Sequence, residues 1–155
     1  MLDIDRIDLS GLAAALEDQS PFEHRWLINP ETGELVFWTE DDGIDGETVD
    51  LDELDLVAID PVPSYVWYQD MVDFAELLSD DRVARRLGRA LEGRGAFRRF
   101  REELREEYPD LLPVWYAFRD ARALRRAAEW LVDNSLVAED AADRFRARHP
   151  DPDVP

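Results

Sequence analysis

The sequence contains no cysteine and no lysine, and both absences narrow the chemistry open to the chain. Without cysteine it has no disulfides, no thiolate metal sites and no cysteine nucleophile. No apolar run reaches the roughly 18 residues of a membrane span, and no basic segment followed by an apolar stretch indicates a secretory signal. We therefore expect a cytoplasmic protein that makes no membrane contact.

The composition is that of a folded protein despite its high charge. The 155 residues fit one domain of ordinary size. Five Trp, seven Phe and four Tyr supply enough aromatic surface for a core and argue against disorder. All 18 basic residues are arginine, which a GC-rich genome would explain. Together with the net charge of −19, this composition also fits a high-salt cytoplasm, where surface carboxylates keep proteins soluble.

Charge is divided unequally along the chain. Residues 1–81 hold 23 acids against two arginines, a net charge of −21, whereas residues 82–155 hold 14 acids and 16 arginines, a net charge of +2. The two halves either neutralise each other or present different surfaces to different partners. The sequence does not decide between these possibilities.

The first half predicts a short helix followed by a small antiparallel sheet. Ser10 is a candidate N-cap for a helix over residues 12–17. Apolar strands at residues 24–28 and 34–39 flank an Asn-Pro-Glu-Thr-Gly turn, which predicts a β-hairpin. Residues 56–59 form a short apolar run that could add a third strand.

The rest of the chain is predicted to be helical. Ser64 and Ser79 are candidate caps for the first two helices, and Gly93-Arg94-Gly95 predicts a tight turn before the next. The spacing of apolar residues then predicts inward-facing stripes on a helix ended by Pro109 and on a long helix over residues 112–132. The first stripe comprises Phe97, Phe100, Leu104 and Tyr108. A last short helix is expected over residues 138–148.

These elements predict an α+β fold: a two- or three-stranded antiparallel sheet packed with four or five helices. We expect a single globular domain over residues 1–149 and a frayed tail at residues 150–155.

Several motifs form an ordered series along the second half: Tyr68-Gln69-Asp70-Met71, Gly93-Arg94-Gly95-Ala96-Phe97-Arg98-Arg99-Phe100, Trp115-Tyr116-Ala117-Phe118 and Trp130-Leu131. This series resembles that of the UPF0158 family, a prokaryotic family of uncharacterised proteins. The hairpin turn resembles the family's first half too, and the resemblance spans about residues 12–137. It supports the expected fold boundaries and implies no established activity.

The arginine-rich helices are the leading functional candidate. Between residues 82 and 101 there are eight arginines and one acid. Two helices joined by a short glycine turn also outline a helix-turn-helix. The predicted anion- or partner-binding residues are Arg94, Gly95, Arg98, Arg99, Arg101 and Arg105. An exposed tryptophan beside them, with Trp67 and Trp115 as the candidates, would favour a binding site.

The alternative is that these arginines serve only the fold. Arg98/Glu102, Arg99/Glu103 and Asp81/Arg85 are spaced for ion pairs along a helix, each contributing about 0.2–0.5 kcal/mol. The net charge also opposes nucleic-acid binding at long range, because binding depends on neutralising phosphates.

The acidic segment over residues 40–55 is predicted to be a solvated loop. It matches a calcium-binding loop poorly, because Gly43 and Asp52 stand where a short acidic residue and a glutamate are expected. A second functional hypothesis uses the loop as a decoy or inhibitor of a basic protein. Its residues would be Asp41, Asp42, Asp45, Glu47, Asp50, Asp52 and Glu53.

Catalysis has little support in the sequence. There is no nucleophile elbow, phosphate-binding loop, dinucleotide fingerprint or zinc spacing, so we expect no cofactor and no metal site. An enzyme using paired carboxylates is the third hypothesis, to be revived by a pocket holding two inward-facing acids. The leading hypothesis is a non-enzymatic cytoplasmic binding or regulatory module whose arginines contact an anionic partner, either nucleic acid or an acidic protein surface.

Overall fold

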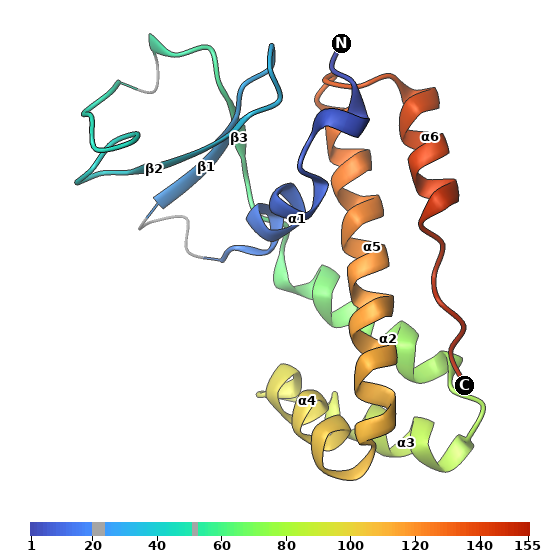
Figure 1. Cartoon of the computed structure of the whole chain (residues 1–155). Helices are drawn as coiled ribbons and strands as arrows, with labels where there is room; N and C mark the ends of the chain where they lie inside the picture. Colours follow the sequence, from blue (N-terminus) through green and yellow to red (C-terminus); the bar gives the residue numbers. More distant parts are fainter. Residues whose placement is uncertain (20–23, 51–52) are drawn as a thin grey trace. The chain divides into compact units, whose positions relative to one another are not determined.

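The computed structural model of the chain describes residues 1–19, 24–50 and 53–155. Its residues form two compact units (Figure 1). The sheet unit comprises Met1–Val62 and Ala123–His149, and the helical unit comprises Pro63–Arg122 and Pro150–Pro155. The expectation of a single domain over residues 1–149 stays a prediction.

The sheet unit contains the predicted hairpin and the predicted third strand. The hairpin is formed by β1 (His24–Ile28) and β2 (Leu35–Thr39), and β3 (Val57–Ile59) pairs with the other edge of β1. All pairing is antiparallel, in the order β2-β1-β3. The unit also holds a short 3₁₀ helix η1 (Ile4–Arg6), α1 (Leu9–Glu17) and the last helix α6 (Glu139–Arg148).

Local chemistry explains the hairpin turn. The Asn29 side chain accepts hydrogen bonds from the backbone N–H groups of Glu31, at 2.9 Å, and Thr32, at 3.3 Å. Gly33 has a φ of +78°, a left-handed conformation that glycine adopts without steric cost. The predicted turn is therefore confirmed, and it fixes the register that places Leu27 opposite Val36.

The predicted helix caps are wrong. Asp8, two residues before Ser10, accepts a first-turn N–H group and caps α1. Asp80, next to Ser79, caps α3 (Asp81–Ala90) in the same way. Ser64 is the first residue of α2 (Ser64–Leu77), whose N-cap has no side-chain hydrogen bond. A carboxylate in the β-region just before the first turn is well placed to accept these N–H groups, and serine and aspartate are similarly favoured there.

The helical unit contains α2, α3, α4 (Ala96–Glu107), the 3₁₀ helix η3 (Pro109–Leu111) and the first part of α5 (Leu112–Asp133). Phe74, Phe100, Trp115 and Phe118 form its aromatic core, with ring centroids 5.1–6.3 Å apart. Trp115 is buried and is therefore not the exposed tryptophan that the sequence suggested. The long helix and the α+β class are confirmed.

A half-buried arginine holds three carboxylates together in the helical unit. Arg122 lies 2.5 Å from Asp73, 3.5 Å from Asp70 and 3.4 Å from Asp151, measured between side-chain nitrogen and oxygen atoms. Its guanidinium carbon lies 4.5 Å from the centroid of the Phe118 ring. Burial by itself would lower the pKa of Arg122, but hydrogen bonds to Asp73 and Asp151 raise it.

The last residues of the chain make specific contacts. The Ser79 N–H group donates to the carbonyl of Pro155 at 3.0 Å. The Val154 side chain packs against the core of the helical unit, and Asp151 belongs to the Arg122 cluster. Residues 150–155 contain no helix or strand.

Candidate functional site

Two glycines shape the turn that joins α3 to α4. Gly93 and Gly95 have φ values of +75° and +76°, which a residue with a side chain rarely adopts. Gly95 occupies the N-cap position of α4 without any side-chain hydrogen bond. The turn predicted at Gly93-Arg94-Gly95 is thus confirmed, and it sets the direction in which α4 leaves α3 (Figure 1).

Arg99 stabilises this turn by hydrogen bonds to its backbone. Its guanidinium donates to the backbone carbonyl of Ala90, at 3.0 Å, and to those of Glu92 and Arg94. These carbonyls belong to the last turn of α3 and the loop after it, where a basic side chain satisfies otherwise unpaired acceptors. Because Arg99 is half-buried and its donors are used within the chain, we leave it out of the proposed binding surface.

Three acidic residues of α4, Glu102, Glu103 and Glu107, are paired with arginines, the last with Arg86 at 3.4 Å. Glu102 lies 2.8 Å from Arg98, and this predicted ion pair is confirmed. Their hydrogen bond raises the pKa of Arg98 and lowers the pKa of Glu102. Glu103 pairs with Arg86 of α3 and not, as the spacing suggested, with Arg99. Likewise Arg85 bonds the backbone carbonyl of Asp81 instead of its carboxylate.

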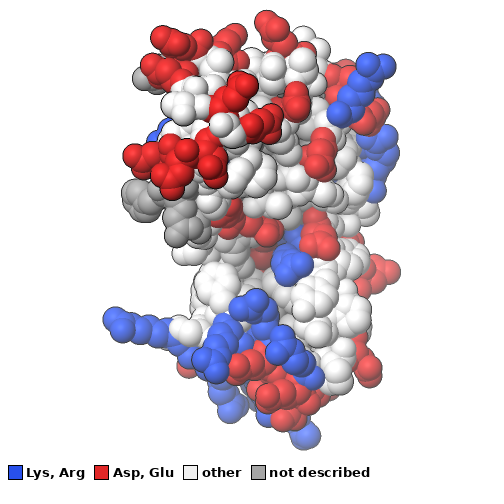
Figure 2. Space-filling model, turned by 60° about the vertical axis from the view of Figure 1, so that its left-hand side comes forward, with Lys and Arg blue, Asp and Glu red and all other residues white. Residues whose placement is uncertain are grey.

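Four arginines remain exposed on the turn and on the outer surface of α4. We call Arg94, Arg98, Arg101 and Arg105 the arginine stripe. Within the described residues, no carboxylate forms an ion pair with Arg94, Arg101 or Arg105, and the Arg98 side chain remains 80% exposed despite its pair. Figure 2 shows basic and acidic side chains gathered together over α3 and α4.

Phe97 lies beside the stripe and is 40% exposed, which contradicts its predicted inward position. The buried residues of α4 are Ala96, Phe100 and Leu104. These three residues are four positions apart and lie on one side of the helix, and Phe97 lies outside that side. The apolar spacing predicted Phe97 to face inward, but Ala96 takes the buried position and leaves the phenylalanine ring exposed.

The described acidic residues of the loop are exposed. Its described acids from the second hypothesis are Asp41, Asp42, Asp45, Glu47, Asp50 and Glu53, whereas Asp52 lies outside the described residues. Bridges between Thr39 and Gly43 and between Ile44 and Glu47 give the first part of the loop a defined path. No group of three or more potential metal ligands occurs in residues 1–19, 24–50 and 53–155.

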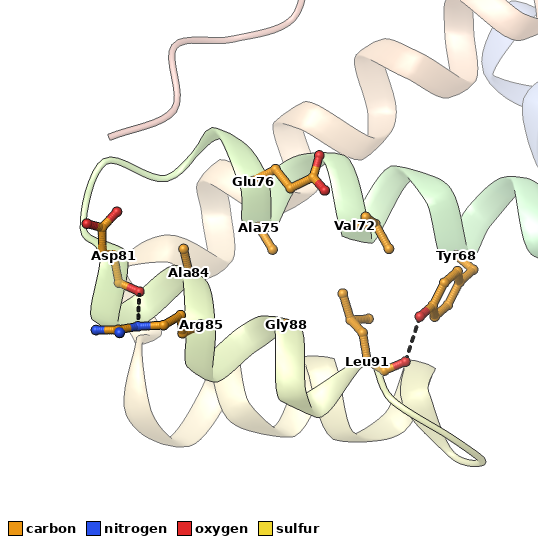
Figure 3. A pocket seen from close by; sticks show the side chains of 9 residues that line it. All are labelled: Tyr68, Val72, Ala75, Glu76, Asp81, Ala84, Arg85, Gly88 and Leu91. Carbon is orange, nitrogen blue, oxygen red and sulfur yellow. Dashed lines mark hydrogen bonds between the residues drawn. The ribbon is translucent and has the colours of Figure 1, made fainter.

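An open groove of about 530 Å³ lies between α2 and α3 (Figure 3). Its floor is formed by small and apolar side chains, and the Tyr68 hydroxyl closes one end by donating to the Leu91 carbonyl at 2.7 Å. Glu76 and Asp81 line it, but their carboxylates lie apart from each other (Figure 3). The groove therefore lacks the facing acids that the carboxylate-enzyme hypothesis requires.

The family match decides which proteins this chain is related to. The family model described as "Uncharacterised protein family (UPF0158)" matches residues 15–146. The chain belongs to the UPF0158 family. A curated relative, named UPF0158 protein PA5073, from Pseudomonas aeruginosa, is 33% identical over 81 residues. That match covers 52% of each chain, so this chain spans about half the length of the relative it matches.

No solved structure matches the chain. The UPF0158 match confirms the resemblance found in the sequence, and residues 15–146 contain both the arginine stripe and the acidic loop. The family description names no activity, so the function has to be argued from the site itself. Among the described helices, none has the length and apolar character needed to cross a bilayer.

Proposed function

We propose that the chain is a non-enzymatic, cytoplasmic binding or regulatory module whose arginine stripe contacts an anionic partner. One observation supports this most: Arg94, Arg101 and Arg105 are exposed and form no ion pair with any described carboxylate, in a chain with 37 acids. Arginine presents a planar fork of donors that fits phosphate and carboxylate oxygens.

The unequal charge of the two units makes this contact possible. The helical unit has 14 acids and 11 arginines, whereas the sheet unit has 23 acids and seven arginines. Charges separated by more than about 8 Å are largely screened at physiological ionic strength. A partner at the arginine stripe therefore responds mainly to the charges within about this distance, among them the four arginines, and less to the net charge of −19.

The first prediction is that removing the three unpaired arginines abolishes anion binding without unfolding the chain. The Arg94→Ala/Arg101→Ala/Arg105→Ala variant should bind labelled anionic probes roughly 100-fold more weakly, since each contact is worth about 1 kcal/mol near a solvated surface. Fluorescence anisotropy at low salt measures this with four probes: a single-stranded oligonucleotide, a duplex, heparin and polyglutamate.

The matched control is Arg6→Ala/Arg25→Ala/Arg144→Ala, which removes the same charge from exposed positions of the sheet unit. This control should bind within about threefold of wild type. Circular dichroism should show both variants folded. If the stripe variant binds every probe as the wild type does, the proposal is wrong.

A second candidate function is supported by the acidic loop. Asp41, Asp42, Asp45 and Glu47 are exposed and form no ion pair with any described arginine, so they could occupy a basic surface of another protein. In this alternative the chain is an acidic interaction protein, a decoy or inhibitor of a basic partner.

The loop prediction uses amide substitutions that preserve side-chain size. Asp41→Asn/Asp42→Asn/Asp45→Asn/Glu47→Gln should weaken binding of a labelled oligo-arginine peptide about tenfold, because four attractive charges are lost. Asparagine suits position 45, where φ is +52°. The control changes four exposed acids of the helical unit, namely Glu92, Glu106, Asp110 and Asp153, to amides. Equal weakening in both variants would show general charge attraction and reject the loop as the site.

A further inference from the structure

We infer that the anionic partner of the arginine stripe is a single-stranded nucleic acid, one base of which stacks on the exposed ring of Phe97. The inference rests on the proposed function and names the partner of the same site. It is carried by the exposed ring of Phe97, which lies beside Arg101 on one flank of α4.

One flank of α4 carries the Phe97 ring beside the guanidinium groups of Arg101 and Arg105. Phe97 and Arg101 are four residues apart on α4 and are therefore neighbours on its surface. The Arg101 guanidinium Nε donates to the Phe97 carbonyl at 3.4 Å, which holds the start of its side chain along the same flank. Arg105 follows one turn later, so the ring and these arginines extend over about 12 Å of helix.

The opposite flank of α4 carries both charges. Glu102, Glu103 and Glu106 line a pocket there together with Arg86, Arg89 and Arg99. Glu102 pairs with Arg98 and Glu103 with Arg86, so these carboxylates are partly neutralised. The exposed Phe97 ring lies on the other flank, beside Arg101.

The exposed ring disfavours a duplex. In a double helix each base is stacked on its neighbours, and turning one out costs a few kcal/mol. A single strand can place a base on the Phe97 ring without that cost, so the helix-turn-helix outline here does not indicate duplex reading.

Phe97 separates nucleic acids from acidic proteins as partners. Arginines bind phosphates and carboxylates alike, but an exposed aromatic ring beside them offers a stacking surface to the flat face of a base. Proteins that bind single strands combine a basic track with aromatic side chains on which bases stack. The 40% exposure of Phe97 beside three unpaired arginines reproduces this combination.

The experiment removes the bases from the probe and the aromatic ring from the protein in separate measurements. The probes are fluorescein-labelled (dT)15, a 15-residue abasic strand of the same charge, and a 15-base-pair duplex. The wild type should bind (dT)15 about tenfold more tightly than the abasic strand, the effect expected for one stacked base, and more tightly than the duplex. Phe97→Leu should bind (dT)15 only as well as the abasic strand, whose own affinity should be unchanged, and Phe97→Trp should restore the preference.

Each outcome has one meaning. Equal wild-type affinity for strands with and without bases, tighter binding of the duplex, or no effect of Phe97→Leu overturns the inference. If abasic-strand binding depends on Arg94, Arg101 and Arg105 but not on Phe97, the proposed function stands while the inference fails. If the three arginines do not matter for the abasic strand, the proposed function itself fails. A U15 strand tested in parallel distinguishes RNA from DNA, and tighter binding of either supports the inference.

Discussion

Replacing Arg122 with methionine should lower the free energy of unfolding by about 3–5 kcal/mol, which is the usual cost of removing one partner from a buried ionic cluster. Arg122 lies within 3.5 Å of Asp70, Asp73 and Asp151, and the Asp70 side chain is only 3% exposed. Methionine can still pack on the Phe118 ring, but it leaves the nearby carboxylates without this cation. Urea unfolding followed by circular dichroism measures the loss.

Arg119→Met is the matched control for this prediction. Arg119 lies on the same helix and contacts the Tyr116 ring, and among the described carboxylates it pairs only with the exposed Asp120, at 3.3 Å. Exposed pairs of this kind contribute at most about 1 kcal/mol, so the control should unfold close to wild type. Equal losses in the two variants would mean that the Arg122 cluster contributes no more than a surface pair.

Arg99→Met should cost about 2–3 kcal/mol of stability, although Arg99 lies among the arginines expected to bind a partner. Its guanidinium donates to the carbonyls of Ala90, Glu92 and Arg94, and a hydrogen bond to a charged group is worth more than a neutral one. Thermal unfolding measures the effect. At temperatures where the variant is folded, its affinity for (dT)15 should stay within about threefold of wild type.

Arg98→Met tests whether an exposed arginine of the stripe, unlike Arg99, contributes little to stability. Arg98 is 80% exposed and forms one ion pair along the helix, so its loss should change stability by less than about 0.5 kcal/mol. A large stability loss at Arg98, or unchanged stability at Arg99, would reverse the roles that the structure assigns to these neighbours.

Features decided by neighbouring residues could be predicted from the sequence. The hairpin follows from Asn29 and Gly33, whose preferences act within the turn itself. The Arg98–Glu102 pair is equally local, because residues four apart on a helix are always neighbours. The α+β class, the third strand and the glycine turn were predictable for the same reason.

Features that depend on contacts between distant elements were not predictable. Arg99 reaches carbonyls of the preceding helix and its following loop, and Glu103 meets Arg86 only because α3 and α4 pack together. Trp115 is buried because three phenylalanine rings surround it. The predicted N-caps of α1 and α3 were wrong for a simpler reason. An aspartate and a serine lie close together at each helix start, and the two residue types are similarly favoured as N-caps.

The sequence indicated the segment of the candidate site but not which of its residues are exposed and unpaired. Arginine counts and the glycine turn pointed to this segment, and the arginines of the stripe are exposed. Their separation from Arg99, and the presence of Phe97 beside them, required the helical arc that Ala96, Phe100 and Leu104 bury.

Binding at the arginine stripe can be observed by an NMR titration that follows the arginine Nε–H signals while (dT)15 is added at low salt. We expect the signals of Arg94, Arg101 and Arg105 to shift together and saturate. The signals of Arg99, whose Nε–H donates to the Ala90 carbonyl, and of Arg122, whose Nε is buried, should keep their positions. Shifts confined to other arginines, or no saturable shift at any of the three, would show that the stripe is not the binding surface.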